Sequence, residues 1–234
     1  MSTIPANLQA VQQRIAAAAR AASRDPHEVA LLAVSKTFGA DAVIEAAQAG
    51  QTAFGENYLQ EALSKVAEVG ARRPDLLLEW HFIGPIQSNK TRPIAEHFAW
   101  VHSVDREKVA QRLSDQRPAH LPPLNVCLQV NISGEASKSG ALSEEAERIA
   151  KLIAGMPRLR LRGLMAIPEP VQGFEAQRAP FRALRGLFER LRGAGLEIDT
   201  LSMGMSGDIE AAITEGATIV RVGTAIFGAR HYAK

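Results

Sequence analysis

Lys36 stands at the end of a short apolar run, and its position is the first in the chain to suggest covalent chemistry. The run covers residues 29–34, and Gly39 and a helical pattern follow Lys36 almost at once. In a parallel α/β barrel, the carboxyl ends of the strands carry the chemistry. A lysine amine that is partly desolvated there has a lowered pKa and can form a Schiff base with a carbonyl. The alternative is a solvated lysine that merely closes a strand.

Two turns near the end of the chain are rich in glycine and hydroxyl groups. Residues 201–208 lead into a helical segment, and residues 220–225 contain the end of the next predicted strand and the turn after it. Phosphate sites in barrels are often built from the loops after the last two strands together with a helix amino terminus. Ser206, Gly223 and Thr224 suit that role. Each turn alone could equally be a serine helix cap or a tight turn, but together at adjacent strand ends they favour a phosphate site.

Arg221 lies in the middle of the last predicted strand. It alternates with Val220 and Val222, so its side chain should point into the barrel near the mouth. Such a charge needs a partner, either in an ion pair or on the ring nitrogen of a cofactor, which is one way in which proteins tune pyridoxal phosphate. With Lys36 as the partner of an aldehyde and the last turns as a phosphate cradle, the ligand predicted is pyridoxal 5′-phosphate.

Short apolar runs alternate with amphipathic stretches along the whole chain. The runs are 29–35, 52–55, 80–83, 99–102, 124–130, 161–166, 200–203 and 218–222. The helical candidates between them are 41–49, 57–69, 87–97, 105–116, 143–154, 174–192 and 206–215. Eight strand–helix units predict a single closed (β/α)8 TIM barrel. An open doubly wound sheet is the alternative, although no G-x-G-x-x-G turn follows any strand.

The first 24 residues predict a helix that packs on the barrel. Leu8, Val11 and Ile15 are spaced three and four apart and form a helical stripe, while Ser2 or Thr3 could cap the helix. No linker or low-complexity segment interrupts the sequence. We therefore expect residues 1–234 to form one barrel domain.

Composition describes an ordinary globular protein and excludes several partners. Of the 234 residues, 46% are hydrophobic and 22% are charged, and the formal charge of +2 gives no support to nucleic-acid binding. Cys127 is the one cysteine; it lies in an apolar run, and we interpret it as part of the core. No disulfide can form within the chain, and a cysteine-based metal site is not expected. With no apolar stretch long enough to span a membrane and no secretory signal, we expect a cytoplasmic protein.

Several motifs carry a resemblance over nearly the whole chain. They are LAVSKT at 32–37, FGENY at 54–58, HFIGPIQSNK at 81–90, VNISGEASKSG at 130–140, RGLMAI at 162–167, and the segments 201–206 and 220–228. With these motifs the chain resembles the YggS/PROSC family of pyridoxal-phosphate-binding proteins, relatives of the alanine racemase barrel. One departure is Gly207, where the family commonly has an acidic residue just before Asp208.

The resemblance implies a type III pyridoxal-phosphate fold with the cofactor linked to Lys36. It further implies ring packing by Ile83 and cofactor contacts at Asn57, Ser206, Arg221, Gly223 and Thr224. The function implied is control of intracellular vitamin B6 supply and of amino-acid and keto-acid balance, with apo-enzymes that use pyridoxal phosphate as possible recipients. His81 and His102 end strands, and we interpret them as structural histidines without chemistry.

Arg221 argues against catalysis. A guanidinium only donates, so a ring nitrogen that it contacts stays an unprotonated acceptor and the ring is a weaker electron sink. In the racemases that this barrel resembles, the opposing tyrosine comes from a second domain, whereas this sequence stops soon after the last predicted strand. We therefore expect a monomeric carrier and not an enzyme.

Two alternatives remain open at this point. One is a small amino-acid racemase that uses Lys36 with Tyr58 or a water molecule as the second base. The other is an aldolase-type barrel whose Lys36 attacks a phosphosugar carbonyl without any cofactor.

Overall fold

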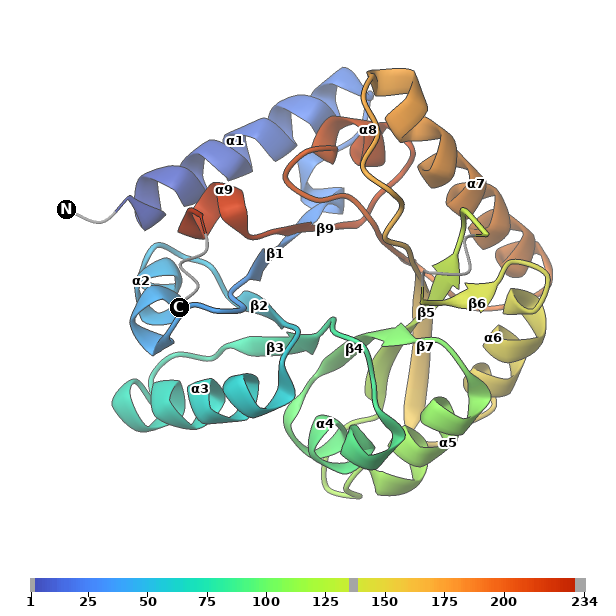
Figure 1. Cartoon of the computed structure of the whole chain (residues 1–234), viewed down its shortest axis with the longest axis horizontal. Helices are drawn as coiled ribbons and strands as arrows, with labels where there is room; N and C mark the ends of the chain where they lie inside the picture. Colours follow the sequence, from blue (N-terminus) through green and yellow to red (C-terminus); the bar gives the residue numbers. More distant parts are fainter. Residues whose placement is uncertain (1–2, 135–138, 230–234) are drawn as a thin grey trace.

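Eight parallel strands form a closed barrel in the computed structural model, which describes residues 3–134 and 139–229. The strands are β1 (Ala30–Val34), β2 (Ala53–Glu56), β3 (Glu79–Phe82), β4 (Trp100–Val104), β5 (Leu124–Asn131), β7 (Leu159–Met165), β8 (Thr200–Ser202) and β9 (Ile219–Val222). Pairing of β1 with β9 and of β4 with β5 closes the ring (Figure 1). The barrel prediction is confirmed, and the open sheet is excluded.

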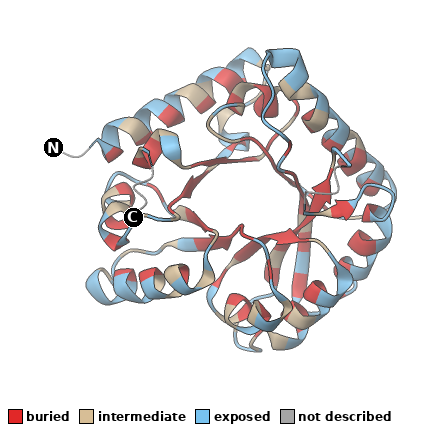
Figure 2. Ribbon diagram, in the orientation of Figure 1, coloured by how far each residue is buried: buried red, intermediate tan, exposed pale blue. Residues whose placement is uncertain are grey.

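Helices surround the barrel because each strand is followed by an amphipathic stretch. They are α1 (Ile4–Ala21), α2 (Ala40–Gln48), α3 (Leu59–Arg72), α4 (Thr91–His97), α5 (Glu107–Gln116), α6 (Ala146–Ala154), α7 (Phe174–Gly193), α8 (Ile209–Thr214) and α9 (Thr224–Phe227), with 3-10 turns η1 (Pro26–Glu28) and η2 (Ser88–Lys90). Figure 2 shows their buried faces turned toward the strands and their exposed faces outward. Within the described ranges, no helix is long and apolar enough to cross a membrane.

The short elements differ from the sequence prediction. A two-residue strand, β6 (Ala141–Leu142), pairs with the end of β5, and the four-residue helix α9 follows β9. Neither is long enough to show a hydrophobic period, so the sequence pattern missed both. Helix α8 begins at Ile209, three residues later than predicted.

Helix α1 lies along the outside of the barrel against α8 and α9 (Figure 1). Leu8, Val11 and Ile15 are buried in this contact, as the stripe predicted. Thr3 occupies the N-cap position, but its hydroxyl accepts no backbone N–H of the helix. Arg14 forms an ion pair with Glu210 and donates to the carbonyl of Ser206 at 2.7 Å, so α1 also holds the loop after β8.

The barrel interior contains two apolar clusters with a polar layer beside them. One cluster consists of Leu32, Val34, Ile83 and Ile219, and the other of Trp100, Cys127 and Met165. The polar layer consists of His81, His102, Ser202 and Arg221, all buried. Burial raises the pKa of the Cys127 thiol to about 12, so this cysteine is an inert part of the core, as the sequence predicted.

Candidate functional site

A cavity of about 230 Å³ lies at the carboxyl end of the strands and contains every residue predicted for the cofactor. Those residues come from five parts of the chain: Lys36, Asn57, Ile83, Ser206, and the group Arg221, Gly223 and Thr224. Val34, Phe38, Ile167, Met205, Gly207 and Gly228 complete the lining. The fold therefore brings the predicted residues together, because parallel strands all end at the same face of a barrel.

Lys36 enters this cavity from a strained turn directly after β1. Its side chain is partly buried, and the next residue, Thr37, has a φ of +69°. A β-branched residue rarely adopts this left-handed conformation, and such strain persists only where neighbouring groups impose it. The Thr37 N–H donates to Glu61 Oε1 at 2.6 Å, which fixes the turn.

A buried ion pair behind Lys36 supports the same turn. Lys65 Nζ lies 2.6 Å from Glu56 Oε1, with side-chain exposures of 3% and 0%. Lys65 also donates to the carbonyl of Ser35 and to Glu61, and the Ser35 hydroxyl donates to Glu56. Burial raises the pKa of the Glu56 carboxyl, against the attraction of Lys65. No motif of the sequence predicts this group, although Lys65 shares the buried face of α3 with Ala62 and Val69.

Asn57 and Ile83 lie where the ends of β2 and β3 meet. The Asn57 Oδ1 atom is buried and has no hydrogen-bond partner among the described residues. The backbones approach closely here, since a Cβ added at Gly84 would lie 2.1 Å from the Asn57 carbonyl oxygen. Asn57 thus presents an acceptor that a bound molecule can satisfy.

Ser206, Gly223 and Thr224 line the cavity from the loops after β8 and β9. The Met205 N–H donates to Asp208 Oδ1 at 2.5 Å, so Asp208 shapes this loop although Gly207 departs from the family pattern. Gly223 lies against the end of β1, where an added Cβ would lie 3.0 Å from the Val34 carbonyl oxygen. The first N–H groups of α9 follow directly, and such groups have no partner inside their helix.

Arg221 is 4% exposed and points into the barrel as predicted. It donates to Ser202 Oγ at 2.8 Å and to the Ala166 carbonyl at 2.9 Å. No carboxylate of the described residues lies within ion-pair distance, so its direct partners are neutral. Burial lowers the pKa of Arg221 to about 10, which leaves the guanidinium protonated at neutral pH.

Tyr58, the side chain considered as a second base, does not belong to this lining. The Tyr58 side chain is 51% exposed and stands at the N-cap position of α3. Tyr232 lies outside the described residues, as do Ser2 and residues 135–138 of the predicted 130–140 motif. Within the described residues, no group of three His, Cys, Asp or Glu side chains could hold a metal ion.

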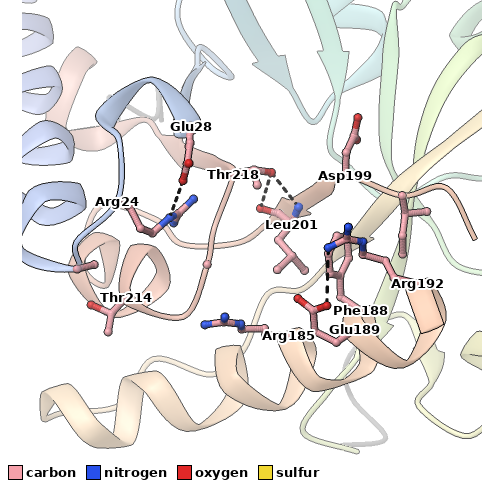
Figure 3. Close-up of a pocket in the computed structure, with 13 residues that line it drawn as sticks. Arg24, Glu28, Arg185, Phe188, Glu189, Arg192, Asp199, Leu201, Thr214 and Thr218 are labelled. Carbon is pink, nitrogen blue, oxygen red and sulfur yellow. Dashed lines mark hydrogen bonds and ion pairs between the residues drawn. The ribbon is translucent and has the colours of Figure 1, made fainter.

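A second cavity, of about 550 Å³, opens at the other end of the barrel (Figure 3). Four of its charged side chains form two pairs: Arg24 with Glu28 at 3.3 Å and Arg192 with Glu189 at 3.7 Å. None of the residues predicted for the cofactor lines it.

Comparison with known proteins places the chain in a family. Residues 6–231 match the family model described as "Alanine racemase, N-terminal domain". The chain belongs to the alanine racemase N-terminal domain family. Within this family it is 66% identical to the pyridoxal phosphate homeostasis protein of Pseudomonas aeruginosa, over 99% of this chain and 98% of that protein. It is 54% identical to the Escherichia coli protein of the same name, over the full length of both. These relatives confirm the resemblance that the motifs indicated.

Solved structures of this family agree with the fold. PipY from Synechococcus elongatus with pyridoxal phosphate bound is 37% identical to this chain, with a TM-score of 0.78 over 92% of it and 100% of PipY. PipY without pyridoxal phosphate gives 36% identity and a TM-score of 0.84 over 96% of this chain and 100% of PipY. The alanine racemase of Corynebacterium glutamicum shares 20% identity and a TM-score of 0.64, over 97% of this chain and 62% of the racemase, which supports the fold alone.

Proposed function

We propose that this protein binds pyridoxal 5′-phosphate as a Schiff base on Lys36 and serves vitamin B6 homeostasis in the cytoplasm. The observation that carries the proposal is the single cavity lined by all seven predicted residues. The names of the Pseudomonas and Escherichia relatives and the pyridoxal phosphate in PipY support it.

The residues present suit this cofactor. Asn57 Oδ1 is a buried acceptor without a partner in the described chain, and the backbone at Gly223 lies so close to Val34 that an added Cβ would crowd it. When bound, pyridoxal phosphate supplies an aldehyde that condenses with a primary amine with loss of water. Lys36 offers the only lysine amine in the described lining.

The other residues of the cavity would bind and orient the cofactor. Arg221 would donate to the ring nitrogen and keep it unprotonated, because a guanidinium with a pKa of about 10 retains its proton. Ser206, Gly223 and Thr224 would hold the phosphate with hydroxyl and N–H groups. Ile83 would pack on the ring.

The lining favours a carrier over a racemase. Among the described residues around the cavity, Lys36 and Arg221 are the only ones that carry an amine, guanidinium, carboxyl, imidazole, thiol or phenol. Racemisation needs bases on both faces of the substrate carbon, and a permanently protonated guanidinium is not one. A carrier needs only the lysine. We further propose that the protein is a monomer that delivers its cofactor to apo-enzymes.

Reduction with borohydride tests the proposal. Protein mixed with pyridoxal phosphate should show a visible absorption band that is lost on reduction, with the pyridoxyl adduct on Lys36. Lys36→Ala should lose the band, whereas Lys108→Ala, a change on helix α5 outside this cavity, should keep it. An adduct that persists in Lys36→Ala would refute the assignment. Turnover of D- or L-alanine would favour the racemase, and a phosphosugar adduct without any cofactor band would favour the aldolase.

A further inference from the structure

A continuous line of buried hydrogen bonds runs from the cavity to the opposite end of the barrel. Arg221 donates to Ser202 Oγ at 2.8 Å, and Ser202 Oγ lies 2.7 Å from His102 Nδ1. His102 Nε2 lies 2.9 Å from His81 Nδ1, and His81 Nε2 lies 2.8 Å from Glu79 Oε1. The line therefore links β9, β8, β4 and β3.

Donor and acceptor chemistry gives this line one direction. Arg221 can only donate, so Ser202 accepts from it. Ionised Glu79 at the other end can only accept, so the hydroxyl proton of Ser202 is given to His102 Nδ1. A neutral His102 then carries its proton on Nε2 and donates to His81 Nδ1. His81 in turn carries its proton on Nε2 and donates to Glu79, an acceptor when ionised.

The surroundings agree with neutral histidines between a cation and an anion. Burial lowers the pKa of both His81 and His102, that of His102 well below the ordinary value. The pKa of the Glu79 carboxyl is lowered by the hydrogen bond from His81 and by the nearby Trp100 and Arg162. Glu79 is the first residue of β3, and its side chain is half exposed. His81 also stacks on Trp100, with ring centroids 5.4 Å apart.

We propose that Glu79, His81, His102 and Ser202 are positioning residues that orient the Arg221 guanidinium and offset its buried charge from the far end of the barrel. Ser202 and Ala166 use one N–H on each terminal nitrogen of Arg221, which leaves other N–H groups for a ligand in the cavity. The effect on pyridoxal phosphate rests on the proposed function, but the proton arrangement does not.

Nitrogen NMR of the histidine rings, recorded without any cofactor, tests the proton arrangement. In the wild-type protein, His81 and His102 should both be neutral and carry the proton on Nε2; the variants His81→Gln and His102→Gln assign their signals. In Glu79→Gln the amide can also donate, so the reverse direction becomes available and protonation on Nδ1 should appear in both rings. Glu28→Gln, a change of a similarly exposed carboxylate bonded to Arg24, should leave both rings unchanged. Wild-type rings protonated on Nδ1, or rings unaffected by Glu79→Gln, would overturn the proposal.

Cofactor binding tests the consequence for Arg221. Ser202→Ala should weaken pyridoxal phosphate binding by about tenfold, the loss expected for one hydrogen bond to a charged group, and should shift the visible band. Ser202→Thr, which keeps the hydroxyl, should restore both, and Ser114→Ala, a buried serine of helix α5, should change neither. Equal affinity and an equal band in Ser202→Ala would contradict the positioning role. A protein that binds no cofactor but shows the predicted ring protons would refute the proposed function alone.

Discussion

Lys65 illustrates how a single buried charge can set the geometry of the turn that carries a binding lysine. Its ammonium group satisfies Glu56, Glu61 and the Ser35 carbonyl, and these groups flank the turn on which Lys36 stands. A buried pair of this kind is weak evidence for stability by itself, because desolvation offsets the attraction. Its value here is the fixed position of residues 35–37.

Removing the ammonium should be costly because Glu56 would stay buried without its partner. Lys65→Met should lower the free energy of unfolding by about 3–5 kcal/mol, measured by urea denaturation. Lys151→Met is the matched control, since Lys151 Nζ also lies 2.6 Å from a glutamate oxygen, that of Glu147, but its side chain is more than half exposed. That change should cost less than about 1 kcal/mol. Similar losses in the two variants would show that burial does not decide the effect.

Several individual residues of the cavity could be predicted, because their position next to a predicted strand already indicates where they lie. Lys36, Ser206, Gly223 and Thr224 follow strand ends, and Arg221 alternates with valines, so sequence position was enough to bring them together. The line of hydrogen bonds through His81 and His102 could not be predicted from the sequence. It depends on which residues of four different strands lie at the same level inside the barrel. The sequence predicts both histidines to be structural, and the structure gives each of them hydrogen-bond partners.

Among the elements, the eight strands and the longer helices could be predicted because hydrophobic runs and periods are long enough to count. The predicted strand ends differ from the observed ones by at most two residues, while β6 and α9 have no counterpart in the prediction. The close approach of the loops after β2 and β3 had no sequence signal, since it depends on which two loops become neighbours.

Gly84 should be the residue that permits this approach. A Cβ there would lie 2.1 Å from the Asn57 carbonyl oxygen, so in Gly84→Ala the two loops must separate. We expect a loss of about 1–3 kcal/mol of stability, measured by thermal unfolding, together with weaker cofactor binding. Gly70→Ala meets nothing within 4 Å on the exposed face of α3 and should instead stabilise the protein by about 0.5–1 kcal/mol. An unchanged melting temperature in Gly84→Ala would contradict the role of this contact.

For the whole molecule, the two interior histidines should make stability depend on pH. Their pKa values lie below 6.5 in the folded protein, so below pH 6.5 the unfolded chain binds more protons than the folded one. Stability is therefore fully present above pH 6.5 and is lost as the pH falls, with a slope of at most about 2.7 kcal/mol per pH unit for two groups.

Urea denaturation between pH 7 and pH 5 measures this slope. His102→Gln should reduce this slope, because the pKa of His102 lies well below its ordinary value, whereas His97→Gln, at an exposed position on α4, should leave the slope unchanged. A wild-type stability that is flat over this range would show that the interior histidines titrate normally.

The closure of the barrel also affects how the chain folds while it is being synthesised. Strand β1 is synthesised early, but one of its two neighbours is β9, and Ala30 pairs with Ile219. Helix α1, made earlier still, packs against α8 and α9. During translation the ribosome therefore releases an apolar helix face and an unpaired strand edge long before their partners exist, and such surfaces are prone to aggregate. The nascent chain should depend on chaperones until its last strand has been made.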